Sequence, residues 1–308
     1  MSEPKSRKHP VLFIVFNRPD TTKKVFEMIR LYQPEKLYIT ADGPREHNNE
    51  DVINTEAVKD IFHNVDWNCE VYYNYSQKNQ GCKMGCFNGI SWFFAHEEAG
   101  IILEDDCLPS LKFFEYCDYM LPRFKDSDIY CIGGSQIFSE LQLSTIQRTK
   151  YPLIWGWASW RDRWEKFSFN LPDFKEMQIT FYTQQEKNYW RNKHKEITYF
   201  PDLVNTWDYY WLFSIWANGG KCLIPPINLI QNIGFVTGGT HFKAGESKYE
   251  VKAEDEINIE SIYIPRSKLF PDSILDLMIF NTFFGKGRFL RKTVVKGWVY
   301  EIKKWFKR

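Results

Sequence analysis

The sequence predicts an α/β fold with an open, mixed and mostly parallel β-sheet that has helices on both faces. Two observations predict it. Up to Gly133, short apolar runs alternate with helical stretches, which is the rhythm of strands joined by crossover helices. The runs at 11–16 and 100–103 are apolar at nearly every position, as expected of strands covered on both faces. With 308 residues, the chain can form one large domain or two.

Each element follows from its local sequence. Asn17-Arg18-Pro19-Asp20 closes the first strand and opens the first helix, and the polar turn at 77–81 ends the third strand. A later helix opens at 205–211. We expect strands at 11–16, 36–40, 69–75, 100–103 and 129–133, and helices at 21–31, 51–62, 84–97 and 110–124. No low-complexity linker interrupts the chain, so we expect one domain over 1–282, with a first half of about 10–135 and a second of about 136–282.

The composition is that of a soluble globular protein, with 40 Lys and Arg, 39 Asp and Glu, and 44% hydrophobic residues. Disorder, collagen and coiled coil are excluded. The aromatic share of 18% fits either a rich core or a site that stacks on sugar rings. The stretch 286–308 carries nine Lys or Arg and one Glu, while the rest of the chain is mildly acidic. Because the basic residues gather in one tail, nucleic-acid binding is disfavoured.

Localisation signals point to the cytoplasm. No run of eighteen apolar residues exists, and the first ten residues are polar, without a stretch of signal-peptide type. The seven cysteines are an odd number scattered among apolar neighbours, and the spacing of Cys82 and Cys86 suits neither a zinc knuckle nor a redox CxxC. We expect reduced thiols and no membrane span.

The strongest chemical signal is the acidic triplet Glu104-Asp105-Asp106, which follows the apolar run at 101–103. The carboxyl ends of strands are where open α/β sheets bind ligands. Adjacent carboxylates repel one another, and Mg²⁺ or Mn²⁺ completed by phosphate oxygens would relieve that repulsion. A solvated acidic turn is the alternative interpretation.

Five motifs in a fixed order resemble those of GT-A glycosyltransferases, over about 11–242. More narrowly, the chain is similar to the bacterial sugar transferases loosely called hemolytic-protein-like, and to the inverting N-acetylglucosaminyltransferases that extend mannose. The resemblance implies a GT-A type sheet. The motifs are Asn17-Arg18-Pro19, Thr40-Ala41-Asp42-Gly43, Asn79-Gln80-Gly81-Cys82, Ile102-Leu103-Glu104-Asp105-Asp106 and Phe113-Phe114-Glu115-Tyr116.

The resemblance assigns roles on the donor side. It implies that Asp106 binds the metal, while Glu104 and Asp105 contact the sugar or ribose of the donor. Asp42 would contact the base, with Arg18 on the same nucleotide side. Asp42 followed by Gly43 is equally an ordinary turn.

Lys83 and Trp157 are two further candidates for donor binding, and each also has a purely structural interpretation. Lys83 would neutralise a diphosphate, or be a surface lysine. The family places a Gly-Trp turn similar to 155–157 beneath the donor sugar, which implies that Trp157 lines the pocket. Trp157, Trp160 and Trp164 also recur at helical spacing, as a core stripe would.

A glycine-rich stretch at 232–242 corresponds to the donor-closing loop of the family. Thr240 and His241 would reach the diphosphate from it, with His241 as a phosphate donor or an extra metal ligand. A plain surface loop is the alternative.

Asp208 is the candidate catalytic base. An aromatic surround would desolvate its carboxylate and raise the pKa toward the range useful for a general base. A helix-capping aspartate is the alternative. The base of the resembling family lies in a Trp-Asp pair that opens a helix, as Trp207-Asp208 does here. Tyr209 stands where the mannose-extending relatives carry a second acid.

The tail at 283–308 has the pattern of a basic amphipathic helix. Apolar residues that include Trp298 and Trp305 recur at steps of three and four, and lysines fall mainly on the other faces. Such a helix would lie on an anionic membrane surface, or pack on the domain. We therefore expect a peripheral position on the inner face of the membrane.

Together these signals predict an inverting, metal-dependent glycosyltransferase. Its donor would be a nucleotide sugar, namely a UDP-sugar such as UDP-GlcNAc, and its acceptor a hydroxyl of a glycan or lipid-linked acceptor in surface polysaccharide synthesis. One alternative is a nucleotidyltransferase on sugar phosphates. It is disfavoured because such enzymes typically carry a glycine-rich, basic loop after the first strand, whereas this chain has Asn17-Arg18-Pro19 there. The other is a non-catalytic carbohydrate-binding, membrane-associated protein, which has no need for the triplet.

Overall fold

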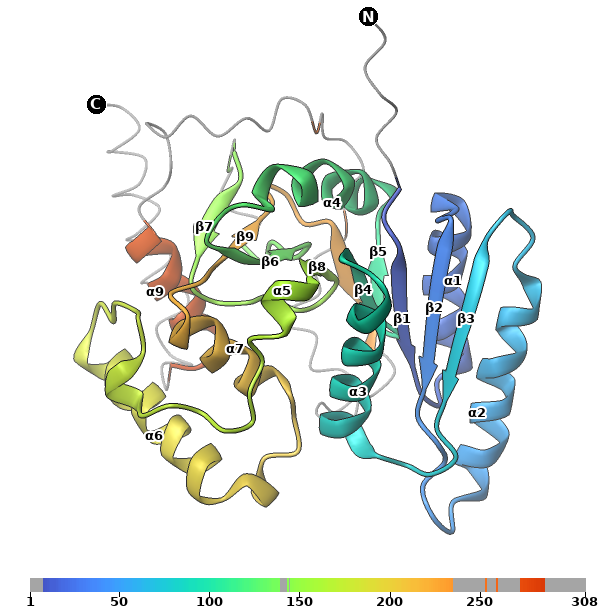
Figure 1. Cartoon of the computed structure of the whole chain (residues 1–308), viewed down its shortest axis with the longest axis horizontal. Coiled ribbons are helices and arrows are strands. Elements are labelled where there is room, and N and C mark those ends of the chain that lie inside the picture. The colour runs from blue at the N-terminus through green and yellow to red at the C-terminus, as the bar shows by residue number, and fades with distance from the viewer. Residues whose placement is uncertain are drawn as a thin grey trace, which may run out of the picture.

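The computed structural model describes residues 8–138, 143, 145–234, 253, 259 and 272–285. The first half of the chain alternates strictly between strands and helices (Figure 1). Its elements are β1 (Val11–Val15), α1 (Pro19–Tyr32), β2 (Lys36–Ala41), α2 (Asn49–Ile61), η1 (Phe62–Asn64), β3 (Glu70–Tyr75), α3 (Gly81–His96), β4 (Ala99–Glu104), β5 (Cys107–Pro109), α4 (Leu111–Phe124) and β6 (Ile129–Gly133). Every strand and helix expected in this half is present.

The second half is less regular and places its longest helix on its outside. Its described elements are β7 (Gln147–Thr149), β8 (Trp157–Trp160), α5 (Arg161–Trp164), η2 (Phe174–Glu176), α6 (Gln184–Tyr199), η3 (Pro201–Leu203), α7 (Asp208–Ala217), β9 (Lys221–Ile224), β10 (Ile230–Asn232) and α9 (Asp272–Phe283).

The described strands form one eight-stranded sheet in the order β3-β2-β1-β4-β8-β6-β9-β7, and β10 pairs with β5 in a second, two-stranded sheet. The strands β1 to β4 are mutually parallel, whereas β8 runs antiparallel between β4 and β6, and β7 runs antiparallel to β9. The predicted α/β class with a mixed, mostly parallel sheet is confirmed. Because β1 lies between β2 and β4, the chain reverses its direction of winding there, which is where such sheets bind ligands.

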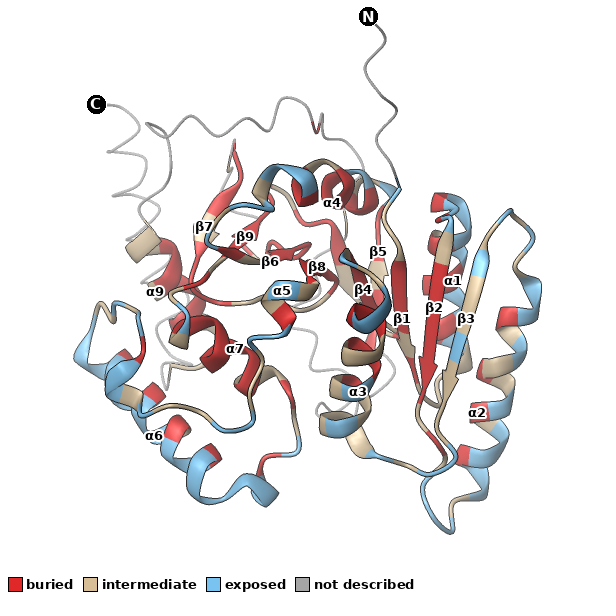
Figure 2. Cartoon of the chain, in the orientation of Figure 1, coloured by how far each residue is buried: buried red, intermediate tan, exposed pale blue. Residues whose placement is uncertain are grey.

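Two hydrophobic cores cover the two faces of the sheet. Along β1, Phe13 joins the core under α1, α2 and α4, while its neighbour Leu12 joins the core under α3 and α7. Successive side chains of a strand point to opposite faces, so a strand buried on both sides is apolar throughout. Figure 2 shows the resulting band of buried residues through the middle of the molecule.

The structure corrects the interpretation of the three tryptophans as one face of a helix. The spacing of Trp157, Trp160 and Trp164 suggests one helix, but β8 is extended from Trp157 to Trp160 and α5 begins at Arg161. All four residues of β8 are buried. A central strand that is covered on both faces carries apolar residues at any spacing, so steps of three and four arise without a helix.

The chain beyond Gly285 lies outside the described residues, and with it most of the predicted amphipathic tail at 283–308. The last described helix, α9, ends at Phe283. Across the described ranges, none of the helices has the length and apolar character to cross a bilayer.

Candidate active site

A cleft of about 680 Å³ opens at the carboxyl ends of β1 to β4. Four of the predicted donor-side residues line it: Arg18, Asp42, Glu104 and Asp105. The sheet explains their convergence, because the carboxyl ends of parallel strands meet at one edge. Further polar lining comes from the sequence motifs and from the predicted helix start, namely Asn17, Thr40, Asn79, Gln80 and Asn205. No role was predicted from the sequence for the other polar lining residues, namely Arg45, Glu50, Asn54, Asn74, Ser76 and Asn88.

The acidic triplet at the end of β4 is bound by Arg18, which precedes α1. Nη1 of Arg18 donates to Oδ2 of Asp106 at 2.9 Å, and Nη2 donates to Asp105. The backbone N–H of Phe16 also donates to Asp105, at 3.3 Å. Arg18 therefore holds the second and third acids of the triplet together.

One guanidinium does not neutralise three neighbouring acids. Burial, followed by repulsion from Asp106, holds the pKa of Glu104 well above its usual range. Burial raises the pKa of Asp105 to about 6, against the opposing effect of Arg18. Burial alone would lower the pKa of Arg18, but the two aspartates raise it above its ordinary value. Ionisation of Glu104 and Asp105 is thus unfavourable in the free site, and a further cation would favour it.

The donor atoms fit a hard divalent cation. Carboxylate oxygens suit Mg²⁺ and Mn²⁺, and Mg²⁺ usually takes one or two carboxylates and completes its shell with water and phosphate. Within the described ranges, no three His, Cys, Asp or Glu side chains gather as a complete metal cage. The residues therefore fit a cation held by Asp106 and by substrate phosphate oxygens. Asp106 suits that role because its side chain is 18% exposed.

The end of β10 passes closely over Asp106. The N–H of Ile233 donates to the backbone oxygen of Asp106 at 2.8 Å. A Cβ built on Gly234 would collide with Oδ2 of Asp106 and lie 3.1 Å from its Cγ. A side chain at 234 would therefore displace the Asp106 carboxylate, at the point where the second half of the chain reaches the triplet.

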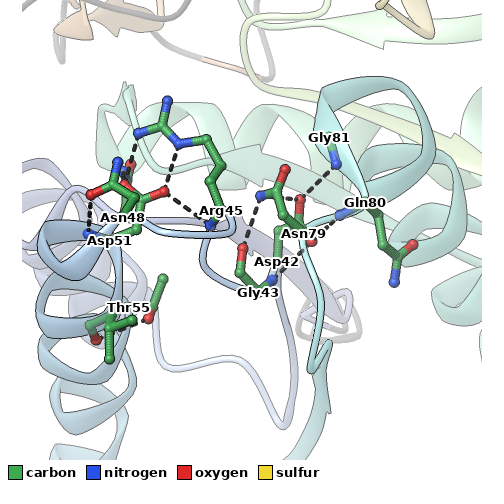
Figure 3. A network of polar contacts seen from close by, with 11 residues as sticks. Asp42, Gly43, Arg45, Asn48, Asp51, Thr55, Asn79, Gln80 and Gly81 are labelled. Atoms are coloured by element: carbon green, nitrogen blue, oxygen red, sulfur yellow. Dashed lines mark hydrogen bonds and ion pairs between the residues drawn. The ribbon is translucent and has the colours of Figure 1, made fainter.

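Asp42 accepts hydrogen bonds from a loop of its own half (Figure 3). Its Oδ1 accepts from the N–H groups of Gly43 and Gln80, both at 2.8 Å. Its Oδ2 accepts from Gly81 N–H at 3.0 Å and from Asn79 Nδ2 at 3.1 Å. Burial raises the pKa of Asp42, and the three backbone N–H groups oppose that shift. These four donors match the hydrogen-bonding capacity of one carboxylate, so Asp42 fixes the start of α3 as well as lining the cleft.

A second buried carboxylate, Asp51, orients Arg45 at the rim of the cleft (Figure 3). Asp51 is 1% exposed and accepts from Asn17 Nδ2 at 2.7 Å and from Nε and Nη2 of Arg45 at 2.5 and 2.7 Å. The bonds from Arg45 are the main reason why the pKa of Asp51 falls to about 2. The guanidinium also lies 5.7 Å from the ring centroid of Phe16. No sequence pattern indicated this pair, whose members belong to a loop and to the first turn of α2.

Lys83 does not line the cleft. Its Nζ donates to the backbone oxygens of Pro201 at 2.9 Å and Val204 at 3.3 Å, and lies 5.1 Å from the ring centroid of Tyr210. Lys83 therefore connects α3 of the first half to the 201–204 segment of the second half.

Trp157 is 1% exposed and lies in the core. Its ring stacks on Trp207 with centroids 5.8 Å apart and packs against Trp211 and Trp164. Its Nε1–H has no acceptor among the described residues. The structure places this indole behind the cleft instead of in its lining.

Asp208 is the first residue of α7, three positions after Asn205, which lines the cleft. Its Oδ1 accepts from Tyr209 N–H at 2.8 Å and from the hydroxyl of Thr206. Its carboxylate is half-buried. Thr240 and His241 lie outside the described residues.

All seven cysteines are free thiols. Cys82 and Cys86, one turn apart on α3, both line the cleft. A hydrogen bond with Cys82, followed by burial, raises the pKa of the Cys86 thiol. The Cys86 thiol is therefore protonated and weakly reactive near neutral pH.

The fold and the cleft define an α/β protein with an acidic binding site at the switch point of its sheet. No family model matches the chain, and no curated protein matches it in sequence. Solved structures of similar architecture include UDP-glucose pyrophosphorylase complexed with UDP-glucose, at 10% identity and a TM-score of 0.42, covering 75% of this chain and 95% of that one. HddC from Yersinia pseudotuberculosis matches at 9% identity and a TM-score of 0.31, covering 50% of this chain and 77% of that one. At these values the likeness carries no argument about function.

Proposed function

We propose that the protein is a metal-dependent glycosyltransferase of the GT-A type that uses a nucleotide-diphosphate sugar. The observation that carries the proposal is the lining of a cleft of about 680 Å³ at the switch point of the sheet by Arg18, Glu104 and Asp105. Asp106 is not part of that lining but accepts a hydrogen bond from Arg18, which belongs to it. That position and volume suit a nucleotide sugar, and the carboxylates suit a cation that binds its diphosphate.

The donor would lie across the first half of the chain, with its diphosphate at the triplet and its base toward β2 and β3. Asp106 would hold Mg²⁺ or Mn²⁺, which supplies charge stabilisation for the leaving diphosphate. The polar side chains of Asn54, Asn74 and Ser76 line the far end of the cleft and can bind a base or ribose. We propose UDP as the nucleotide, following the resemblance.

The acceptor would enter from the second half, beside Asn205 and Asp208. The acceptor hydroxyl oxygen forms a bond to the anomeric carbon, and the bond from that carbon to the diphosphate oxygen breaks. Asp208 takes the hydroxyl proton, and the nucleoside diphosphate leaves with the bonding electron pair. A single displacement of this kind inverts the anomeric configuration. The support is positional, because Asp208 opens α7 three residues after Asn205, which lines the cleft, while Asp208 itself lies outside the lining.

We propose that the acceptor is a glycan or a lipid-linked glycan at the inner face of a membrane. The support is the basic, amphipathic sequence of the tail, which stays a prediction because it lies outside the described residues.

A screen of nucleotide sugars, with and without Mn²⁺, tests the proposal. We expect one donor to be slowly hydrolysed to nucleoside diphosphate and free sugar in the presence of the metal. Formation of a nucleotide sugar and pyrophosphate from a nucleoside triphosphate and a sugar phosphate would instead identify a nucleotidyltransferase. Nucleotide-independent glycan binding, without turnover of any donor, would favour the non-catalytic alternative.

A further inference from the structure

The end of α6 and the following turn expose large apolar side chains. We define the apolar tip as Tyr199, Phe200 and Leu203, which are 70%, 58% and 77% exposed. Single exposed apolar residues are common on soluble proteins, but three large ones within five positions form a local patch. Figure 2 shows the end of α6 as an exposed projection of the second half.

The tip is held firmly by the residues around it. Lys83 donates to the backbone oxygens of Pro201 and Val204, and Leu203 N–H donates to Phe200 O at 3.0 Å. Ile197 and Val204, on either side of the tip, are 1% and 5% exposed and anchor it in the core. The backbone therefore presents the apolar side chains outward from a braced turn.

A row of cations leads along α6 to the tip. Lys187, Arg191 and Lys195 recur at steps of four, which places them along one side of the helix, and the next step is Tyr199. All three are exposed, and none forms an ion pair with a residue that the structure describes. We call them the basic row.

Two acids are adjacent to the basic row in sequence. Glu186 is buried and pairs with Lys150, and Glu196 pairs with Lys193, both at 2.7 Å. Asp202 is exposed within the tip, so the three cations of the row outnumber it.

An apolar tip beside unpaired cations is complementary to an anionic lipid surface. Phe, Leu and Tyr side chains enter the headgroup boundary, while Lys and Arg keep their charges among the lipid phosphates. We propose that the apolar tip inserts into the interfacial region of an anionic bilayer and that the basic row lies against its surface. This surface is separate from the predicted C-terminal tail, and the proposal does not depend on the reaction.

The position of the apolar tip would place the proposed bilayer contact near the cleft. Asn205, two residues after Leu203, lines the cleft, and Figure 1 shows the end of α6 on the same side of the molecule as the carboxyl ends of β1 to β3. A bilayer that receives the tip would therefore lie beside the cleft mouth.

Vesicle sedimentation with the full chain tests the proposal. The vesicles are phosphatidylcholine with and without phosphatidylglycerol. We expect Phe200→Ser combined with Leu203→Ser to weaken binding at least about tenfold, because two apolar side chains no longer leave water. Replacing Lys187, Arg191 and Lys195 by Gln should weaken binding roughly a hundredfold on the phosphatidylglycerol vesicles alone.

The matched control is Val52→Ser combined with Ile53→Ser on α2, where the side chains are 49% and 69% exposed. This variant should bind as the wild type does, and all variants should unfold at the wild-type temperature. Because the C-terminal tail is unchanged throughout, equal binding by the tip variant and the control would overturn the proposal. Failure of the wild type to bind either vesicle would also overturn it. A wild-type dimer that the tip variant dissociates, with vesicle binding unchanged, would assign the tip to a second copy of the chain instead.

Discussion

The charged side chains around the cleft and those buried in the second half have different roles. In the first half, Asp42, Asp51 and Asp105 lie at or beneath the cleft and accept hydrogen bonds from the loops that shape it. In the second half, Lys150, Glu186 and Asp276 are each 0% exposed and lie away from the cleft lining. Charge therefore shapes the binding surface at the cleft, whereas the buried charges of the second half join elements of the fold.

The buried charges of the second half connect three of its elements. Lys150, next to β7, pairs with Glu186 of α6 at 2.7 Å. Asp276 of α9 accepts from Thr149 Oγ1 at 2.6 Å and from the N–H of Lys150 at 3.0 Å. Substitutions should therefore separate activity from stability according to whether they fall at the cleft or among these buried charges.

The largest expected effect is that of Asp106→Ala, which should reduce donor turnover to background and abolish metal-dependent nucleotide binding. The variant loses the carboxylate that we assign to the cation, while Arg18 keeps Asp105 as a partner. Donor hydrolysis and calorimetric titration with a nucleoside diphosphate measure both effects. The exposed residue Asp60 provides the control, since Asp60→Ala should change neither. Normal activity of Asp106→Ala, or activity unaffected by excess EDTA, would exclude the metal assignment.

Asp208→Asn should lower the transfer rate by roughly 10²–10⁴-fold with little change in donor affinity, because a general base acts mainly in the transition state. Asparagine keeps the oxygen that accepts from Tyr209 N–H, so α7 should begin unchanged. Steady-state kinetics combined with donor titration separate rate from affinity. If donor affinity collapses while turnover at saturation is normal, Asp208 is a binding residue.

Lys150→Met should lower the free energy of unfolding by about 3–5 kcal/mol, because it leaves Glu186 as an uncompensated buried charge. Lys193→Met removes the surface pair with Glu196 and should cost at most about 1 kcal/mol. Urea unfolding measures both, and nucleotide affinity of the folded protein should stay normal. A change below about 1 kcal/mol for Lys150→Met would contradict the role given to the buried pair.

The smallest effect concerns the pH dependence of stability. Burial raises the pKa of Asp276 to about 6, above the value of about 3.9 in an unfolded chain. At a pH between these two pKa values, Asp276 is protonated in the folded state and ionised in the unfolded state. The free energy of unfolding should therefore fall as pH rises from about 4 to about 6. The full contribution is at most about 3 kcal/mol.

Asp276→Asn should remove this contribution, since the amide does not titrate and keeps an oxygen for Thr149. The measurement is urea unfolding of both proteins at several pH values between 4 and 7. Parallel curves for wild type and variant would show that Asp276 is not the titrating group.

The sequence predicted the first half well because its signals are local. Apolar runs closed by turns mark the strands, and β6 spans the expected residues. The triplet and Arg18 meet because parallel strands end at one edge of the sheet, which also follows from the pattern.

The second half could not be predicted to the same extent because tertiary packing decides it. The strand β8 is buried on both faces, so its residues carry no helical or alternating period. Only the start of α6 carries a local signal, because Thr183 and Glu186 have the spacing of a capping box. In the structure, the Thr183 hydroxyl oxygen accepts from Glu186 N–H at 3.1 Å. Lys83 and Trp157 lie outside the cleft lining because of contacts that local sequence does not encode, namely those to Pro201 and Trp207.

The four hydrogen bonds to Asp42 bear on the entropy of ligand binding. Three of them, from Asn79, Gln80 and Gly81, immobilise the loop at 79–81 in the free protein, so this wall of the cleft is ordered before any ligand arrives. A ligand that docks on an ordered wall loses less free energy to loop ordering, and more of its contact energy is retained as affinity. The amide protons of Gln80 and Gly81 should accordingly exchange slowly with solvent in the free protein and change little in their exchange rates when the cleft is filled.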